Sequence, residues 1–324
     1  MKIKKAFLLA VTAVLSLAVF AVAGCSSSSG SSSSEASSAM SASDTAAVGE
    51  TDPFYVLIVG NDSRTGTTEK DIEYYSDGTG RSDTIMLMRV DPTTYKVGIV
   101  SIPRDTTCEL NGSKVKINET YHQNGIEGLK SAIKDLTGVQ VKYYFDTTFV
   151  GYENFVDSIG GVVANVPINM SLKDIVSGSQ VSLTAGDNQM LDGKEALVLA
   201  RQRKQYADWG DVCRQMQNRA VVEGVIKRVA ESDNASMYTD ALYAVAKSDM
   251  PKDDLAAVVE DFSKNASKIS FVDGSGPYEG GTDPDTNEWL TYRDESTWSW
   301  VINAIEQGDD PQKIVSLPND KAAK

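Results

Sequence analysis

Residues 84–103, TIMLMRVDPTTYKVGIVSIP, contain two short apolar runs that are rich in β-branched residues and bounded by turn-forming residues. Such runs predict buried strands over residues 84–90 and 97–103. The same pattern in FYVLIVG predicts a third strand over residues 54–60. Three further strands are predicted at residues 141–145, 162–166 and 269–272.

Segments with apolar residues at helical spacing lie between and after these strands. One of them, residues 125–138, ends at Gly138, and glycine commonly closes helices. Further helices are predicted at residues 147–161, 192–203, 211–230, 236–247, 251–264 and 295–308. Because strands alternate with helices, we expect an α/β fold, namely a single α/β/α domain whose central mixed sheet is covered by helices on both faces.

The N-terminus has the features of an export signal. Lys2, Lys4 and Lys5 precede an apolar run, and the string VAGC at residues 22–25 resembles a lipobox. We therefore expect a lipoprotein signal peptide over residues 1–24 and lipidation at Cys25. The alternative is an uncleaved transmembrane anchor, since the apolar run is just long enough to span a bilayer.

A serine-rich segment follows the signal. Serine occupies 12 of residues 26–43, so residues 25–50 are expected to be a flexible tether to a catalytic domain at residues 51–324. The formal net charge is −14, and loss of the three signal lysines would make it −17. A surface with this charge repels nucleic acid, so we expect no nucleic-acid partner. The export signal and the anchor predict a protein held on the outer face of the membrane.

Charged residues gather where predicted strands begin or end. Asp62 follows the first strand, Arg81 and Asp83 lead into the second, and Arg104 and Asp105 follow the third. In α/β sheets, ligands bind beyond the carboxyl ends of strands. These residues are therefore candidates for one binding site.

A second group of charges lies in LARQRKQYADWGDVCRQMQNRA, residues 199–220. Arg201 and Arg203 end one predicted helix, and Asp211, Arg214 and Asn218 share a face near the start of the next. Several guanidinium groups around one site repel each other unless an anion binds there, and they match phosphate oxygens in a bidentate way. A pyrophosphate fits this description.

Two carboxylates beside a pyrophosphate would repel it unless a cation lay between them. Mg²⁺ typically takes one or two carboxylates plus substrate phosphates, so Asp62 and Asp83 are candidate magnesium ligands. Arg219 lies five residues after Arg214 and is expected to point away from the site, so that its removal would be nearly silent.

Other site classes find little support. His122 is the single histidine, so no multi-histidine zinc site exists, and we expect it to be a polar loop residue. The chain has no G-x-x-x-x-G-K loop and no G-x-G-x-x-G motif. In an exported protein, Cys108 and Cys213 are expected to form a disulfide, with two buried free thiols as the alternative.

Eight motifs occur in the order of the LytR-CpsA-Psr (LCP) family of cell-envelope phosphotransferases, which the chain resembles over about residues 54–230. They are GNDSR, RSDTIMLM, SIPRDT, KINETY, DSIGGV, LDGKEAL, RQR and DVCRQMQNR. The resemblance implies an α/β/α fold and transfer of a glycan phosphate from a polyprenyl-pyrophosphate carrier to an acceptor hydroxyl, usually of peptidoglycan. Some members carry a cysteine pair at positions like 108 and 213, which supports the expected bridge.

The resemblance also implies residue roles. Those implied to hold the pyrophosphate are Arg81, Arg104, Arg201, Arg203 and Arg214. Asp62 and Asp83 would bind magnesium, Asp211 would orient arginines, and Lys116 would line the site. Asn218 stands where the family commonly has glutamine, which leaves its phosphate contact open. Asp83, together with Arg81, Arg104, Arg201 and Arg203, is expected to act in catalysis, with Asp83 a candidate but poor general base.

The polyprenyl tail requires an apolar slot. Its candidate lining residues are Phe145, Phe149, Tyr152 and Phe155, for which ordinary core packing is the alternative. Two other functions stay open at this point. One is a polyprenyl-pyrophosphate binding protein or hydrolase without glycan transfer, and the other is a solute-binding lipoprotein, for which paired aspartates have no use.

Overall fold

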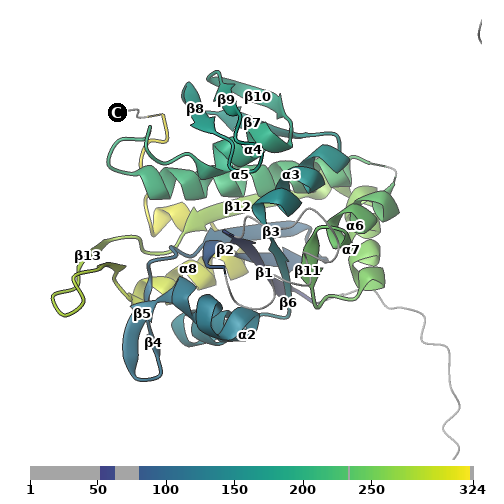
Figure 1. Ribbon diagram of the computed structural model, residues 1–324. Coiled ribbons are helices and arrows are strands. Elements are labelled where there is room, and N and C mark those ends of the chain that lie inside the picture. Colours follow the sequence, from purple (N-terminus) through teal and green to yellow (C-terminus); the bar gives the residue numbers. More distant parts are fainter. Residues whose placement is uncertain (1–51, 63–79, 233, 322–324) are drawn as a thin grey trace, which may run out of the picture. The chain divides into compact units, whose positions relative to one another are not determined.

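A six-stranded mixed sheet forms the centre of the protein, in the order β11-β6-β1-β2-β3-β12 (Figure 1). Neighbours among β1, β2 and β3 run antiparallel, whereas β6 and β12 pair in parallel with β1 and β3. The strands are β1 (Phe54–Asn61), β2 (Ser82–Asp91), β3 (Lys96–Ser101), β6 (Tyr143–Thr147), β11 (Ala246–Ser248) and β12 (Ser270–Ser275). This computed structural model describes residues 52–62, 80–232 and 234–321. The predicted mixed sheet is confirmed.

Two helices, α2 (Ile117–Thr137) and α8 (Glu295–Gln307), cover one face of the sheet (Figure 1). Alternate strand residues such as Leu57 point toward this face and pack in one buried cluster with Leu129 and Trp298. Full burial of one such apolar side chain stabilises the fold by about 1.5–3 kcal/mol.

Four helices lie on the opposite face (Figure 1). They are α3 (Phe149–Ser158), α5 (Gly210–Ala230), α6 (Ala235–Tyr243) and α7 (Lys252–Lys264). Val56 and Met86 point this way and share a cluster with Phe262 of α7. Because both faces carry helices, the predicted α/β/α arrangement is also confirmed.

An outer layer of short strands packs beyond α5 (Figure 1). The strand predicted at residues 162–166 is present as β7 (Val162–Val166), but it pairs with β10 (Gly186–Leu191) and stays outside the central sheet. The hairpin of β8 (Met170–Lys173) and β9 (Gln180–Leu183) and the helix α4 (Gly193–Arg201) complete the layer.

Several elements differ from the prediction. The helix expected at residues 125–138 is the second part of α2, which begins at Ile117 and is interrupted at Gly125, where φ is +63°. His122 therefore lies in a helix and not in a loop. The hairpins β4–β5 (Thr107–Leu110, Ser113–Lys116) and β13–β14 (Gly280–Thr282, Trp289–Thr291) were not predicted, because strands of three or four residues carry almost no periodicity.

The predicted signal peptide at residues 1–24, the lipidation site Cys25 and the tether at residues 25–50 lie outside the described residues. Within the part of the chain that is described, no helix combines the length and the apolar character needed to cross a bilayer.

Candidate functional site

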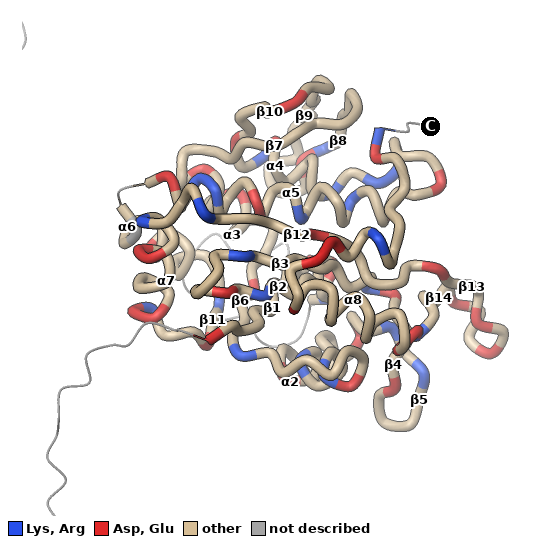
Figure 2. Tube along the Cα trace, turned by 180° about the vertical axis from the view of Figure 1, so that it is seen from behind, with Lys and Arg blue, Asp and Glu red and all other residues tan. Residues whose placement is uncertain are grey.

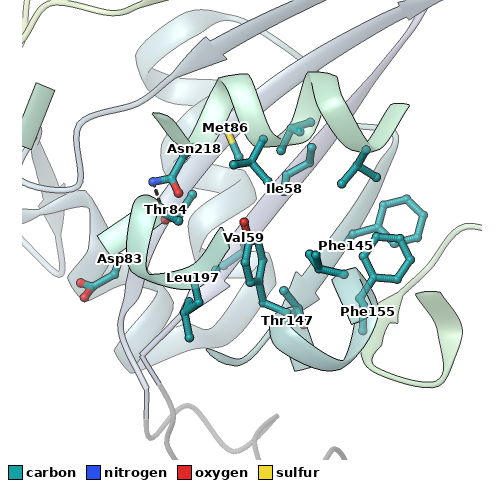
Figure 3. A pocket seen from close by; sticks show the side chains of 18 of the residues that line it. Ile58, Val59, Asp83, Thr84, Met86, Phe145, Thr147, Phe155, Leu197 and Asn218 are labelled. Atoms are coloured by element: carbon teal, nitrogen blue, oxygen red, sulfur yellow. Dashed lines mark hydrogen bonds between the residues drawn. The ribbon is translucent and has the colours of Figure 1, made fainter. Parts of the chain in front are cut away.

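A cavity of about 1100 Å³ lies between α5 and the central sheet, with α3, α6 and α7 contributing to its walls. Its lining divides into a polar part and a longer apolar part. Figure 3 shows Asp83, Thr84 and Asn218 toward one side and Phe145 and Phe155 toward the other. The polar lining residues include Asp62, Asp83, Thr84, Arg104, Arg201, Arg203, Lys204, Asp208, Asp211, Arg214 and Asn218.

The turn between α4 and α5 brings the arginines of the RQR motif to the start of α5. A capping box starts α4: the Asp192 side chain accepts from the Glu195 N–H, and Glu195 accepts from the Asp192 N–H. The helix ends at Arg201. A Cβ on Gly210 would lie 2.5 Å from the carbonyl oxygen of Arg203, so only glycine lets α5 begin this close to Arg203.

Asp211 orients two of the arginines, as predicted. Its Oδ1 lies 3.0 Å from Nη2 of Arg214 and 3.5 Å from Nε of Arg203. Burial of the Asp211 carboxyl favours its protonated form, but Arg214, a Gln215 hydrogen bond and Arg203 together hold its pKa below the ordinary value. An ionised Asp211 keeps the two guanidinium groups side by side despite their like charge.

The two aspartates predicted to bind magnesium both line the polar part of the cavity. Asp83 accepts from Arg104 at 2.5 Å, and Asp62 accepts from the backbone N–H of Arg81 at 2.9 Å. The strand ends therefore bring together Asp62, Asp83 and Arg104 as the sequence indicated.

The Asn218 amide donates to Oγ1 of Thr84 at 3.4 Å, and Arg214 lies at the same distance from that oxygen (Figure 3). Thr84 thus connects β2 with α5 at the polar end of the cavity. Asn218 lines the cavity and contacts a hydroxyl that sequence reasoning did not single out, and its contact with a phosphate stays open.

Arg81 and Lys116 are placed differently from the prediction, and neither lines the cavity. Arg81 is 54% exposed and pairs with Glu119 of α2 at 3.1 Å. Arg81 precedes β2, and the β1–β2 ladder shifts register between Gly60 and Asn61, so Arg81 and Asp83 are not alternate residues of a regular strand. Lys116 lies 3.3 Å from Asp105, beside the Arg104 loop.

The apolar part of the cavity contains all four predicted aromatic residues, Phe145, Phe149, Tyr152 and Phe155. The Arg201 guanidinium lies 5.0 Å from the ring centre of Phe149, within the range of a cation–π contact. This contact joins the charged end of the cavity to its apolar wall.

The family model described as LytR_cpsA_psr matches residues 19–307. The chain belongs to this family. Its membership accounts for the order of the motifs that line the cavity. A curated relative, the polyisoprenyl-teichoic acid–peptidoglycan teichoic acid transferase TagU of Bacillus mycoides, is 32% identical over 206 residues, which are 63% of this chain and 62% of TagU. The alignment thus spans less than two thirds of that relative.

Solved structures share the LytR_cpsA_psr fold. TagV of B. subtilis matches with a TM-score of 0.65 at 20% identity, covering 83% of this chain and 99% of TagV. A structure described as TagT bound to LI-WTA matches with a TM-score of 0.62 at 20% identity, covering 82% of this chain and 92% of that chain. At this identity the likeness supports the fold.

Arg219, in the last motif of this LytR_cpsA_psr chain, points away from the cavity as expected but is not a surface residue. It is 1% exposed, lies 2.7 Å from Asp273 of β12 and donates to Ser101 at 2.8 Å. Figure 2 shows basic segments along α5 and an acidic segment on neighbouring β12. Because the guanidinium is buried against Asp273 and Ser101, removal of Arg219 should destabilise the fold, and its small expected effect on transfer itself stays a prediction.

The predicted Cys108–Cys213 disulfide was also wrong, since both cysteines are free and buried. Cys108 packs in the cluster beneath α2 and α8, whereas Cys213 packs with Tyr206 in the outer cluster. Two thiols in separate clusters lack the close approach that a disulfide requires. Burial raises the pKa of each thiol to about 11, so both cysteines stay protonated and unreactive near neutral pH.

Sequence reasoning missed several polar residues that line the cavity, among them Thr84, Lys204 and Asp208. Thr84 lies within the RSDTIMLM motif and follows Asp83 directly, while Lys204 and Asp208 lie between the two predicted helices. Lys204 and Asp208 had no sequence signal beyond proximity to the arginines, because a loop has no periodicity from which the direction of a side chain could be inferred.

Proposed function

We propose that the protein transfers a glycopolymer from a polyprenyl-pyrophosphate carrier to an acceptor hydroxyl, usually on peptidoglycan. The observation that carries this proposal is a single cavity that joins an arginine-rich end to a long apolar part. A polyprenyl pyrophosphate has the same two-part chemistry. The name of the TagU relative describes transfer of teichoic acid from a polyisoprenyl carrier to peptidoglycan, which supports the same reaction class here.

The pyrophosphate binds at the polar end. Arg104, Arg201, Arg203 and Arg214 line that end, and guanidinium groups donate paired hydrogen bonds to phosphate oxygens. Asp211 keeps Arg203 and Arg214 oriented toward the same ligand. The polyprenyl chain follows the aromatic wall of the cavity.

The reaction is a substitution at the phosphorus nearer the sugar. The oxygen of the acceptor hydroxyl forms a new P–O bond, the bond to the bridging oxygen of the pyrophosphate breaks, and polyprenyl phosphate leaves with that oxygen. The hydroxyl proton is released to solvent. The arginines stabilise the negative charge that spreads over the equatorial oxygens in the transition state.

We also propose a magnesium ion between the pyrophosphate and the carboxylates of Asp62 and Asp83. The donor set fits, because both carboxylates line the polar end and magnesium takes one or two carboxylates together with phosphate oxygens. Among residues 52–62, 80–232 and 234–321, no cluster of three or more acidic, histidine or cysteine side chains could hold a metal alone. Bound there, the ion would neutralise charge on the phosphates.

A transfer assay tests the proposal. Purified protein is given a short-chain polyprenyl-pyrophosphate glycan and peptidoglycan, with Mg²⁺ or with a chelator. We expect glycan linked covalently to peptidoglycan and one polyprenyl phosphate released per linkage, and little of either with the chelator. Release of polyprenyl phosphate together with free glycan phosphate would identify a hydrolase instead, and binding without turnover would identify a carrier-binding protein.

The N-terminal anchor is a separate proposal. The lysine-led apolar run and the VAGC string support cleavage before Cys25 and lipidation of its side chain, which would hold the protein on the outer face of the membrane. Mass spectrometry of protein extracted from the native membrane tests this. An intact Met1 would point to the uncleaved transmembrane anchor.

A further inference from the structure

An exposed tryptophan lies at the start of α5, between residues that line the polar end of the cavity. Trp209 is 46% exposed and is the residue just before α5. Its sequence neighbours Asp208, Gly210 and Asp211 all line the cavity. Single exposed apolar residues are common on protein surfaces, so it is the position of this ring beside the cavity, and not its exposure, that indicates a ligand contact.

The ring of Trp209 is held in place from behind. It meets the ring of Tyr278 edge to face, with centroids 5.8 Å apart and an interplanar angle of 83°. The Tyr278 hydroxyl donates to the carbonyl oxygen of Ser316 at 2.7 Å, and the backbone oxygen of Trp209 accepts from Cys213 at 2.9 Å. A ring fixed in this way loses little conformational entropy when a ligand stacks on it.

Trp209 is also close to the pyrophosphate end. The backbone of Gly210, the next residue, lies against the carbonyl of Arg203. Arg203 in turn lies 3.5 Å from Asp211. A sugar joined to a phosphate held by Arg203 would therefore lie within reach of the indole.

We propose that Trp209, supported by Tyr278, forms a glycan subsite in which the indole stacks on a hexopyranose ring. This inference rests on the proposed function and adds a binding site for the sugar part of the substrates. One face of a pyranose is lined by C–H groups, which pack on the apolar ring, while the indole N–H donates to a hydroxyl.

The charges around the indole favour a neutral, hydroxyl-rich ligand. Asp208 lines the neighbouring cavity wall, and exposed Glu279 follows Tyr278. Carboxylates accept hydrogen bonds from sugar hydroxyls but repel anionic lipid headgroups. A sugar ring therefore fits this surface better than an anionic membrane does.

Binding measurements on the full chain in detergent test the subsite. The two probes are a polyprenyl pyrophosphate without sugar and the same carrier bearing a disaccharide. We expect Trp209→Ala to weaken binding of the sugar-bearing carrier by about tenfold and to leave binding of the sugar-free carrier unchanged. Trp209→Phe keeps a ring and should lose less.

The matched control is Trp300→Ala. Trp300 is 60% exposed on α8, which covers the other face of the sheet, so its removal should change neither affinity. The donor sugar and the acceptor sugar have the same ring chemistry. A second measurement, the KM for peptidoglycan fragments, distinguishes which of the two binds at Trp209. A higher KM for peptidoglycan fragments with unchanged donor affinity would assign the subsite to the acceptor sugar.

Two results would overturn the subsite: an equal loss of affinity for both carriers, which means a structural role, or no loss of donor affinity together with an unchanged acceptor KM. Failure of the proposed function looks different. In that case the wild-type protein binds neither carrier, and the subsite inference falls with it.

Discussion

Arg214 and Arg219 lie five residues apart on α5 and do different things. Arg214 faces the cavity, contacts Asp211 and reaches toward Thr84. Arg219 faces the sheet, where it is buried with Asp273 and Ser101. At 3.6 residues per turn, five residues rotate a side chain by about 140°, which is enough to move it from the cavity to the protein interior.

This difference teaches that an arginine in a conserved-looking string can be there for binding or for the fold. Spacing predicted correctly that the two point apart, but not that the Arg219 guanidinium is buried against Asp273 of β12. The cavity face of α5 is available to a ligand. The opposite face connects α5 to β12 through Arg219.

The largest effect is expected for Arg219→Ala. The Arg219 side chain is buried whereas Asp273 is 30% exposed, so the change removes two charge-assisted hydrogen bonds and should lower the free energy of unfolding by about 3 kcal/mol. Urea unfolding measures it, with Lys227→Ala on the same helix as the control, since Lys227 is 57% exposed and its pair with Glu223 contributes little. Equal stability of the Arg219→Ala and Lys227→Ala variants would mean that Arg219 contributes no more to the fold than an exposed lysine does.

The second effect concerns activity. Arg203 is 46% exposed, so Arg203→Ala should keep the fold by circular dichroism but lose transfer. A lost charged hydrogen bond costs about 1.5–3 kcal/mol, which corresponds to a roughly 10- to 150-fold drop in kcat/KM. Arg203→Lys should fall between, because an ammonium keeps the charge but not the paired donors. Wild-type transfer rates in Arg203→Ala would contradict the pyrophosphate site.

Two adjacent residues on α3 also point in different directions, one toward the cavity and one into the protein interior. Tyr152 lines the cavity, whereas Glu153 is buried away from it. Burial, followed by a hydrogen bond to Asp174 and its charge, raises the pKa of Glu153 to about 8. Between about pH 4.5 and 8 the folded chain keeps a proton that the unfolded chain has lost, so stability should fall as pH rises. Glu153→Gln should flatten this slope in unfolding curves, and an unchanged slope would exclude Glu153 as its source.

The smallest effect is expected for the thiols. Cys213 precedes Arg214 but lies on the packed side of α5, in a different cluster from Cys108. A reductant should therefore leave the Tm unchanged, and two thiols should react with a thiol reagent once the domain is unfolded without reductant. A drop in Tm on reduction would instead support a Cys108–Cys213 disulfide. Such a bond would link the segment that follows Arg104 to α5.

Part of the binding site could be predicted from local patterns alone. Asp62, Asp83 and Arg104 follow or enter recognisable strands, and the interval between Arg201 and Arg214 is short enough for helix geometry to bring them together. Arg81 was misplaced because a register shift between Gly60 and Asn61 changes its direction. No sequence feature near Arg81 predicts that shift in register.

The sequence by itself determined the α/β/α layers, because alternation and helical spacing are local properties that burial must satisfy. It also determined which arginines meet at the start of α5. Only the tertiary structure decided that Arg219 finds Asp273, that Cys108 and Cys213 are in separate clusters, and that Trp209 rests on Tyr278. These partners are tens of residues or more apart in the chain, and packing, which depends on every layer at once, selects them.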